Sequence, residues 1–419
     1  METETIPGIG LNLIGKKESH TLHEVELRRF PYPYRAALTI CSDIDETDTL
    51  EQHEAVQYFI RKTIGIPFSN SFFPYHDEGK LSLLSGRPSD RSAILEQIRG
   101  GTIDVIHSYG EKKDFSRRDV KPVWEELRKH GCKVEVWVDH KDASSNLCKY
   151  RCNGLGDLPQ CPEYHMDLTV QSGIRFIWTD RLTNLVGQEV PFNWKSVSIL
   201  YDPQHAWDSF INMARTVAKI VLSFLGWRKY DFFKSNCLIH KHRLKDGQWV
   251  YEFIRFNNHF KGAAVGDTFL DLYYLISDKV LSKLKEVEGY CIVYTHLGKK
   301  FAPESQSAEE TVKALRNLKK ENDAGHIFVR SAAEILNYCI RTRYLNWTCK
   351  RQSETYLVHI RSIDDPLFGN YVPDPRMLRN FTFYIPKGAS ARIILDERQI
   401  LNTQINPADY SGRQSITII

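Results

Sequence analysis

The sequence predicts an α/β protein, a distorted (β/α) barrel followed by a small C-terminal β-sandwich domain. Three observations lead to this prediction. Short apolar runs rich in β-branched residues alternate with segments of helical periodicity, an order that favours a parallel sheet. Ionisable residues directly follow several of these runs. After about Arg351, short strands are separated by turn sequences such as Asp364-Asp365-Pro366 and Pro386-Lys387-Gly388. The expected domains are therefore an N-terminal leader (1–30), the barrel (31–350) and the β-sandwich (351–419).

The individual elements follow from periodicity and from capping residues. The clearest strand is Ala36–Ser42, a continuous apolar run. Asp48 or Thr49 is expected to cap the helix that follows it, and Ser89 or Asp90 a second helix. The expected strands are Leu22–Phe30, Ala36–Ser42, Ile103–Ile106, Lys133–Val138, Ile174–Thr179, Tyr290–Tyr294, His326–Val329, Tyr356–Arg361, Phe381–Ile385, Ala391–Leu395 and Ser415–Ile419, with a hairpin of Leu238–Leu244 and Gln248–Phe256 around Asp246-Gly247. The expected helices are Leu50–Ile60, a segment through Ile94–Ile98, Val123–His130, Asp208–Leu225, Asp267–Val287, Ala308–Lys320 and Ser331–Tyr344.

The composition favours an ordinary globular protein. Hydrophobic residues make up 42% and charged residues 26% of the 419 positions, and the formal charge of +4 is small for this length. The basic stretch Arg228–Arg243 is interleaved with aromatic residues and is interpreted as a solvated edge rather than a nucleic-acid platform. No nucleic-acid partner is expected.

The sequence also predicts a cytoplasmic location. The start, Met1-Glu2-Thr3-Glu4, lacks the basic and apolar regions of a secretory signal. No run approaches the roughly 20 apolar residues that cross a bilayer. The nine cysteines have no regular spacing, which suits free thiols in a reducing compartment.

Two acidic residues, Asp43 and Asp45, directly follow the strand Ala36–Ser42. Catalytic groups gather at the carboxyl ends of parallel strands, in barrels and in open sheets alike. Two carboxylates this close together are costly unless a metal neutralises them or one of them holds a proton. The pair therefore predicts a metal or acid–base site, and a polar loop after the strand is the simpler alternative.

Three histidines, His107, His140 and His296, also follow predicted strands. Zinc and similar divalent metals take imidazole and carboxylate ligands, and a catalytic site leaves one position for water. A free carboxylate beside the metal can act as base, and a histidine can act as acid to the leaving group. A single histidine is more often packed than metal-bound, so the shared position at strand ends is what predicts a metal-dependent hydrolase.

Three short motifs occur in a particular order: Asp43-Ile44-Asp45 after the first barrel strand, His107-Ser108 after a later one and Thr295-His296 after a late one. Over residues 30–345 this order resembles the polysaccharide deacetylase superfamily (the NodB-homology domain, carbohydrate esterase family 4). The resemblance implies a distorted (β/α) barrel that removes N- or O-acyl groups from sugars, using a metal bound by one aspartate and two histidines.

Carried over to this chain, the resemblance assigns four roles. Asp43 matches the general base, Asp45 and His107 match metal ligands, and His296 matches the acid that protonates the leaving group. The implied cofactor is a divalent metal, with zinc expected. The implied partner is a carbohydrate substrate, either a glycan or a nucleotide-linked or lipid-linked sugar.

The chain departs from the family's pattern at two places. Glu111 stands where the family's second motif histidine is expected, and Ile44 separates two acids that the family usually has adjacent before a glycine. Glu111 can itself ligate zinc, or His140 can supply the third ligand from the next strand end. In a third alternative the metal is weakly bound or absent. The sequence leaves these alternatives open.

Candidate substrate contacts lie near the same strand ends. The segment Trp137–Asn146 fits no deacetylase motif closely, but it places many polar groups after a strand. Aromatic faces suit sugar rings, although core packing explains most of them. The predicted substrate-binding residues are Tyr109, Trp137, Asp139, Asn146, Asp180 and Arg181, together with Tyr294 and Leu297, which by the resemblance line the acyl pocket.

The predicted function is removal of an acetyl or other acyl group from an amino sugar or sugar ester in polysaccharide metabolism. One alternative is a non-catalytic sugar-binding relative that has lost the metal. Another is a glycoside hydrolase in which Asp43 or Asp45 acts with Asp139 or Asp180. Ser-His-Asp catalysis is not expected, because the chain has no Gly-x-Ser-x-Gly motif.

A zinc knuckle is a further, less favoured interpretation of one loop. Cys148, Cys152 and Cys161 have His165 nearby, but a structural zinc site usually has closer ligand pairs. A loop with free thiols is the preferred interpretation.

Overall fold

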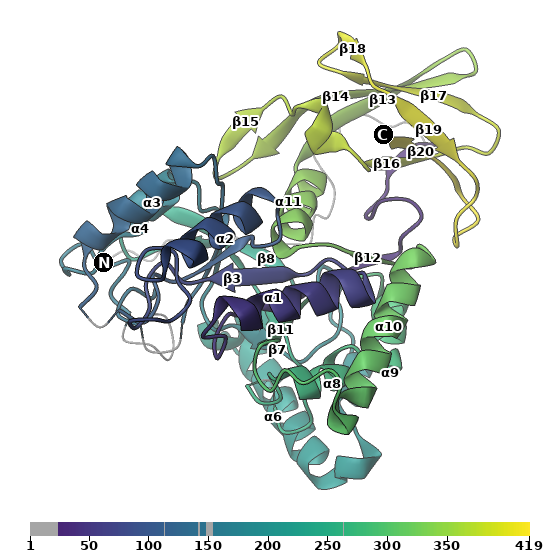
Figure 1. The fold of residues 1–419 in the computed structure, drawn as a ribbon. Helices are drawn as coiled ribbons and strands as arrows, with labels where there is room; N and C mark the ends of the chain where they lie inside the picture. The colour runs from purple at the N-terminus through teal and green to yellow at the C-terminus, as the bar shows by residue number, and fades with distance from the viewer. Residues whose placement is uncertain (1–23, 113, 141–142, 148–153, 263) are drawn as a thin grey trace. The chain divides into compact units, whose positions relative to one another are not determined.

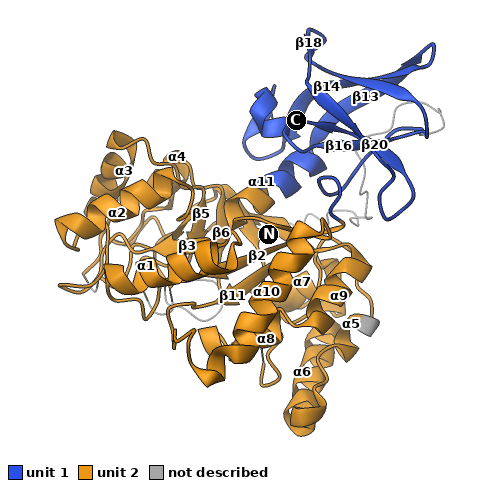
Figure 2. Ribbon diagram, turned by 45° about the vertical axis from the view of Figure 1, so that its right-hand side comes forward, with its two compact units in different colours: residues 1–34, 337–419 blue, residues 35–336 orange. Residues whose placement is uncertain are grey.

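A computed structural model of the chain describes residues 24–112, 114–140, 143–147, 154–262 and 264–419. Two compact units are present (Figure 2). Residues 35–336 form the large unit, and the described residues up to Tyr34 form the small unit together with Asn337–Ile419. The predicted domain boundaries lie at 30/31 and 350/351, whereas the units change after Tyr34 and after Leu336.

The large unit is built on an 11-stranded, curled sheet in the order β7-β10-β11-β2-β3-β4-β5-β6-β9-β8, with β12 also paired with β2 (Figure 1). Each pairing is parallel except that of β8 with β9, which form the antiparallel hairpin predicted around Asp246-Gly247. The prediction of an α/β fold with a parallel sheet is confirmed. The strands are β2 (Ala36–Ser42), β3 (Ser69–Phe72), β4 (Val105–His107), β5 (Val136–Val138), β6 (Phe176–Trp178), β7 (Leu182–Thr183), β8 (Ile239–Arg243), β9 (Trp249–Phe253), β10 (Arg255–Phe256), β11 (Tyr290–Thr295) and β12 (Ile327–Val329).

The strand β2 holds a central place in this sheet. It pairs along its length with β11, and its other edge pairs with β12 near Ala36 and with β3 at Cys41 and Ser42. All seven of its residues are buried. Alternate side chains, at Ala36, Leu38 and Ile40, belong to one apolar core. A strand buried on both faces reads as a continuous apolar run, which is why the sequence predicts it with the observed bounds.

Helices cover the sheet over two apolar cores. The first core joins β2 and β11 to α1, α8, α9 and α10, and the second joins β3, β4, β5 and β6 to α2 and α3. The helices are α1 (Leu50–Tyr58, continued by the π-helix Phe59–Ile64), α2 (Pro88–Arg99), α3 (Val120–Lys129), α4 (Met166–Gln171), α5 (Lys195–Ser198), α6 (Ala206–Phe224), α7 (Asp231–Ser235), α8 (Leu272–Leu275), α9 (Asp278–Val287), α10 (Glu309–Asp323) and α11 (Ala332–Arg343).

Two predicted helix starts have different outcomes. Thr49 caps α1 as predicted, in a capping box with Gln52. The prediction of Ser89 or Asp90 as the cap of α2 is wrong, because the helix begins at Pro88. Asp90 lies inside the first turn and accepts a hydrogen bond from the Arg87 amide at 3.1 Å.

The prediction of a single helix over Asp267–Val287 is also wrong. The structure has a 3-10 turn at Phe269–Asp271, the short α8, and then α9, which starts after an extended residue, Ser277 (φ −61°, ψ 159°). Asp267 therefore lies before the helices, where its carbonyl accepts a hydrogen bond from the His296 amide at 2.6 Å.

The small unit contains two sheets that share one apolar core. One sheet has the order β1-β16-β20-β19, and the other has β13-β14-β17-β18 with β15 paired to β14. The sequence prediction finds β14, β16, β17 and β20, and it extends β1 well beyond its two observed residues. Residues 22–23 of that predicted strand lie outside the described residues. The strands are β1 (Glu26–Leu27), β13 (Leu345–Gln352), β14 (Thr355–Asp365), β15 (Gly369–Tyr371), β16 (Thr382–Ile385), β17 (Ser390–Leu395), β18 (Gln399–Ile400), β19 (Thr403–Asn406) and β20 (Gln414–Ile418).

In the part of the chain that the structure describes, no helix combines the length and the apolar character that crossing a membrane requires.

The start of α11 depends on a buried carboxylate. Asp104 Oδ2 accepts hydrogen bonds from the Ala333 amide at 3.0 Å and from the Ser69 hydroxyl at 2.9 Å. We expect Asp104→Leu to lower the free energy of unfolding by about 1–3 kcal/mol, because it leaves buried donors without an acceptor. Asp104→Asn keeps a hydrogen-bond acceptor, so its free energy of unfolding should fall clearly less than that of Asp104→Leu. Urea denaturation measures both variants, and equal stability of the two would contradict this role.

Candidate metal centre

The site lies at the carboxyl ends of adjacent strands. Asp43 and Asp45 follow β2, His107 is the last residue of β4, His140 lies just beyond β5, and His296 follows β11. These strands are neighbours in one parallel run, with β11, β2, β3, β4 and β5 side by side. Parallel strands bring their carboxyl ends to the same edge, so residues far apart in the chain meet there.

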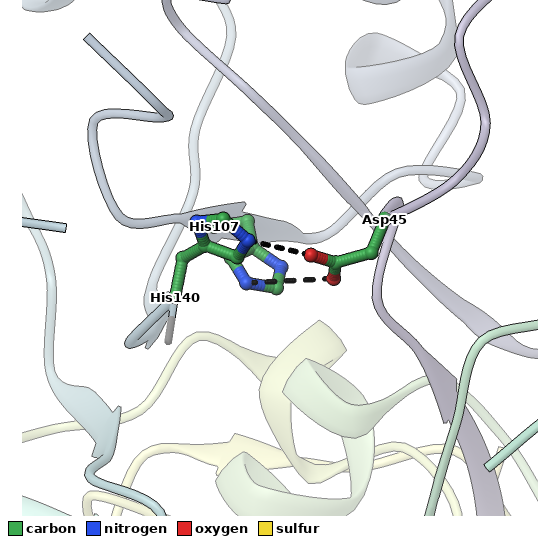
Figure 3. A group of neighbouring side chains, drawn as sticks. All are labelled: Asp45, His107 and His140. Carbon is green, nitrogen blue, oxygen red and sulfur yellow. Dashed lines mark ion pairs between the residues drawn. The ribbon is translucent and has the colours of Figure 1, made fainter. Parts of the chain in front are cut away.

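The carboxylate of Asp45 is the centre of this group. Its Oδ1 lies 2.6 Å from His140 Nε2, and its Oδ2 lies 3.7 Å from His107 Nε2 and 3.2 Å from His296 Nε2. Figure 3 shows Asp45 facing His107 and His140, which approach it from the ends of two other strands. Each of these histidines thus directs Nε2 toward one carboxylate.

The surroundings favour the ionised form of Asp45 and the neutral form of His107. Burial acts to raise the pKa of Asp45, but the nearby His107, His140 and His296 hold it well below its usual value. Burial lowers the pKa of His107 well below its usual value, despite the attraction of Asp45. Burial also acts to lower the pKa of His140, but the hydrogen bond to Asp45 raises it overall. Asp45 and His107 are therefore held in the forms that bind metals, whereas His140 would release a proton on binding one.

Three of these residues form a set of metal ligands. One ligand atom each from Asp45, His107 and His140 lies within 4.8 Å of the other two. Asp45 Oδ2 is buried and, among the described residues, accepts no hydrogen bond of normal geometry. Two imidazoles and one carboxylate suit zinc and other first-row divalent ions, and three protein ligands leave a position open. The residues therefore fit a divalent metal.

The structure places His140, and not Glu111, with Asp45 and His107. The Glu111 carboxylate is partly exposed and lies outside this set, with Oε1 3.4 Å from His140 Nε2. It instead forms a separate group with His76 and Asp77, while Asp43, Asp45 and His296 form a group that overlaps the first at Asp45. Of the two alternatives for the third ligand, the geometry favours His140.

Asp43 is held by a buried arginine that the sequence analysis missed. Arg255, on β10, donates from its two terminal nitrogens to Asp43 Oδ2 at 2.7 Å and Oδ1 at 2.5 Å. The guanidinium carbon lies 4.2 Å from the Trp178 ring centroid and 5.1 Å from that of Tyr294. Burial raises the pKa of Asp43 to about 6, and Arg255 acts in the opposite direction. The arginine thereby fixes the orientation of a carboxylate that titrates close to neutral pH.

His296 has a carboxylate partner that the sequence analysis also missed. Its Nδ1 lies 2.8 Å from Asp267 Oδ2, while its Nε2 faces Asp45. Burial acts to lower the pKa of His296, but the adjacent carboxylates of Asp267 and Asp45 raise it to about 10. Lys299 Nζ lies 3.6 Å from Asp267 Oδ1. The two carboxylates therefore favour the protonated form of His296 in the metal-free site.

Several predicted substrate contacts are enclosed in the protein. Tyr109 and Trp137 are fully buried in the second core. Asp139 is buried and accepts hydrogen bonds from Trp137 Nε1 at 2.8 Å and from the Leu147 amide at 3.0 Å. Asn146 is buried and bonds the backbone of His140 through both ends of its amide, at 2.9 and 2.8 Å. Asn146 thus positions a candidate ligand.

Of the remaining predicted substrate contacts, the structure places Tyr294 beside the site. Tyr294 lies near the site, with its ring centroid 5.2 Å from that of His296, whereas Leu297 is fully buried in the first core. Arg181 pairs with Asp231 at 2.6 Å, and the neighbouring Asp180 has a positive φ of 61°. The structure therefore places Tyr294 beside the site and gives Arg181 an ion-pair partner elsewhere.

The zinc-knuckle interpretation falls partly outside the described residues, which do not include Cys148 and Cys152. His165 is buried, and its ring nitrogens bond the Ser145 carbonyl at 2.6 Å and the Thr169 hydroxyl at 2.9 Å. Both nitrogens are thus engaged within the protein.

Comparisons with family models, with curated proteins and with solved structures give no match to this chain. The side-chain arrangement at the strand ends is therefore the basis on which a function is proposed.

Replacing a ligand should weaken metal binding. We expect His140→Ala to lower zinc affinity more than roughly a hundredfold, the upper range of losses from residues that only support a ligand. Glu111→Ala, its matched control, should change the affinity less than roughly tenfold. Isothermal titration with zinc measures both, and the reverse order of losses would assign the third ligand to Glu111.

The charge on His296 gives a pH prediction for the metal-free protein. Its pKa is raised from an ordinary 6.5 to about 10, so its stabilising contribution is present in full below pH 6.5 and is lost as the pH rises toward 10. NMR of nitrogen-labelled histidines should show His296 protonated at pH 8. Asp267→Asn should lower this pKa, and a neutral His296 at pH 8 in the unchanged protein would contradict the assignment.

Proposed function

We propose that this protein is a divalent-metal-dependent hydrolase that removes an acyl group from a sugar, in the manner of the polysaccharide deacetylases. One observation carries the proposal. A two-histidine, one-carboxylate ligand set lies beside a carboxylate fixed by Arg255 and a histidine fixed by Asp267. Metal-dependent hydrolysis of an amide or ester uses this combination of a Lewis acid, a base and an acid.

The residues divide the work as follows. A divalent metal held by Asp45, His107 and His140 would polarise the acyl carbonyl and lower the pKa of water. Asp43 acts as the base that takes the proton of the attacking water, and Arg255 holds its carboxylate in place. His296 donates the Nε2 proton to the departing amine or alcohol, and Asp267 holds the ring through Nδ1.

The fold and the substrate belong to the same proposal. We propose that the curled sheet is an open form of the distorted (β/α) barrel expected from the resemblance. Three further parts of the proposal rest on the sequence alone. They are the carbohydrate substrate (a glycan, or a nucleotide-linked or lipid-linked sugar), the choice of zinc and the cytoplasmic location. They remain predictions.

The alternatives have less support from the geometry. A glycoside hydrolase needs two available carboxyl groups, but Asp139 is enclosed by Trp137 and Leu147, and Asp45 faces the imidazoles of His107, His140 and His296. A non-catalytic relative that has lost the metal would have no need to keep Asp45, His107 and His140 together as a ligand set.

Acetate release from N-acetylated and O-acetylated oligosaccharides tests the proposal. We expect Asp43→Asn to lower kcat by at least roughly a hundredfold, the lower range of general acid–base contributions, while zinc stays bound. Asp374→Asn, which changes an aspartate of the small unit, is the matched control and should retain full activity. Equal acetate release from Asp43→Asn and wild type would contradict the base assignment. New reducing ends without acetate would indicate a glycosidase.

A further inference from the structure

The helix α6 has an inverted amphipathic pattern. Its most buried positions are Ser209, Asn212, Thr216, Ile220 and Ser223, four of which are polar. They recur at intervals of three and four residues, which places them on one face of the helix. A surface helix normally turns its apolar stripe toward the core, so this helix turns the opposite face inward.

The polar face of α6 is held by hydrogen bonds within the large unit. Thr216 Oγ1 accepts from Asn184 Nδ2 at 2.6 Å, and Asn212 Nδ2 donates to the His259 carbonyl at 3.3 Å. The Asp202 amide donates to Ser209 Oγ at 3.1 Å. These contacts satisfy polar groups of the inward face, so its orientation has a structural cause.

The outward face of α6 is apolar along its whole length. Trp207 is 73% exposed, Phe210 62%, Val221 47% and Leu225 70%. Together with the exposed Ala214 and Ala218, these residues follow helical spacing and form one stripe opposite the polar face. Phe224, the last residue of α6, is 54% exposed, and Leu225 and Trp227 (57% exposed) extend the patch past the end of the helix. Figures 1 and 2 show α6 at the outer edge of the large unit.

Cations border this patch. Arg215, Lys229 and Lys234 are exposed, and Lys234 Nζ lies 5.8 Å from the centroid of the Phe224 ring. Two acids belong to the same stretch, Asp208 and Asp231, and Asp231 is paired with Arg181 at 2.6 Å. The patch therefore combines aromatic and aliphatic side chains with a positive border.

We propose that this face of α6, with Phe224, Leu225 and Trp227, docks on the surface of an anionic lipid bilayer. Tryptophan side chains favour the headgroup region of a bilayer. Phenylalanine and leucine favour the boundary between the headgroups and the acyl chains. Lysine and arginine are attracted to anionic headgroups. The hydrogen-bonded polar face keeps α6 attached to the large unit, so the helix lies in the plane of the surface.

A second copy of the chain fits this face less well. Pairing two such faces would bring Arg215, Lys229 and Lys234 of both copies into one interface, and like charges there are costly. Anionic headgroups complement the same three cations. The proposal is independent of the hydrolytic function, because it uses none of the residues of the metal centre.

Vesicle flotation with the full-length protein tests the docking. Binding should be observed to vesicles of phosphatidylcholine with phosphatidylglycerol and be at least tenfold weaker to phosphatidylcholine alone. Lys229→Gln and Lys234→Gln should each weaken binding about fivefold, the share of one cation near an anionic surface. Trp207→Ser with Phe210→Ser should weaken it at least about tenfold, because both side chains lose their place in the interface.

The matched control is Trp249→Ser, which removes another half-exposed tryptophan of the large unit (50% exposed) from the hairpin strand β9. It should bind vesicles like the unchanged protein, and circular dichroism should show all variants folded. No binding to either vesicle, or equal binding by the Trp207/Phe210 variant, would overturn the proposal. A dimer in analytical ultracentrifugation that this variant converts to monomer would assign the face to self-association and overturn it as well.

Discussion

The burial of Asp43 and the partial burial of Asp45 at the end of β2 are the constraint on which the site depends. A buried charge is costly unless an opposite charge and hydrogen bonds compensate it. Asp43 receives this compensation from Arg255, through two hydrogen bonds of 2.7 and 2.5 Å. Asp45 receives it from His140 and His296, at 2.6 and 3.2 Å. The neighbouring strand ends therefore have to supply cations or a metal, and they supply residues that suit hydrolysis.

The sheet order explains how these partners reach the carboxylates. β2 pairs with β11 on one side and with β3 on the other, and β4 and β5 follow. His296 thus approaches from one side and His107 and His140 from the other, so Asp45 lies between them. Arg255 arrives from β10, which pairs with β11. The site needs all of these parallel strands, although its two acids, Asp43 and Asp45, are separated by one residue of the chain.

Much of this arrangement can be predicted from the sequence, because it depends on local patterns. The strand Ala36–Ser42 is recognised from its apolar run, and a parallel sheet implies that Asp45, His107, His140 and His296 share an edge. The sequence does not show which side chains fill the space between strands, and so Arg255 and Asp267 were missed. Arg255 lies inside the predicted strand Gln248–Phe256, where a single arginine resembles a residue of the exposed face. Asp267 was assigned to a helix because the break at Ser277 has no strong signal such as proline or glycine. Tyr109 and Trp137 have the residue types of a sugar-binding surface, but burial in the core is a tertiary property that composition does not reveal.

The central claim is that Asp45, His107 and His140 together hold a divalent metal. X-ray absorption spectroscopy of the zinc-loaded protein tests this most directly. The account predicts that zinc is bound by two imidazole nitrogens and by oxygen ligands, with zinc–ligand distances of about 2.0–2.2 Å. In the His140→Ala variant, if it is loaded at high zinc concentration, one imidazole should be lost. Sulfur at about 2.3 Å, or a spectrum that the His140 substitution leaves unchanged, would contradict the account.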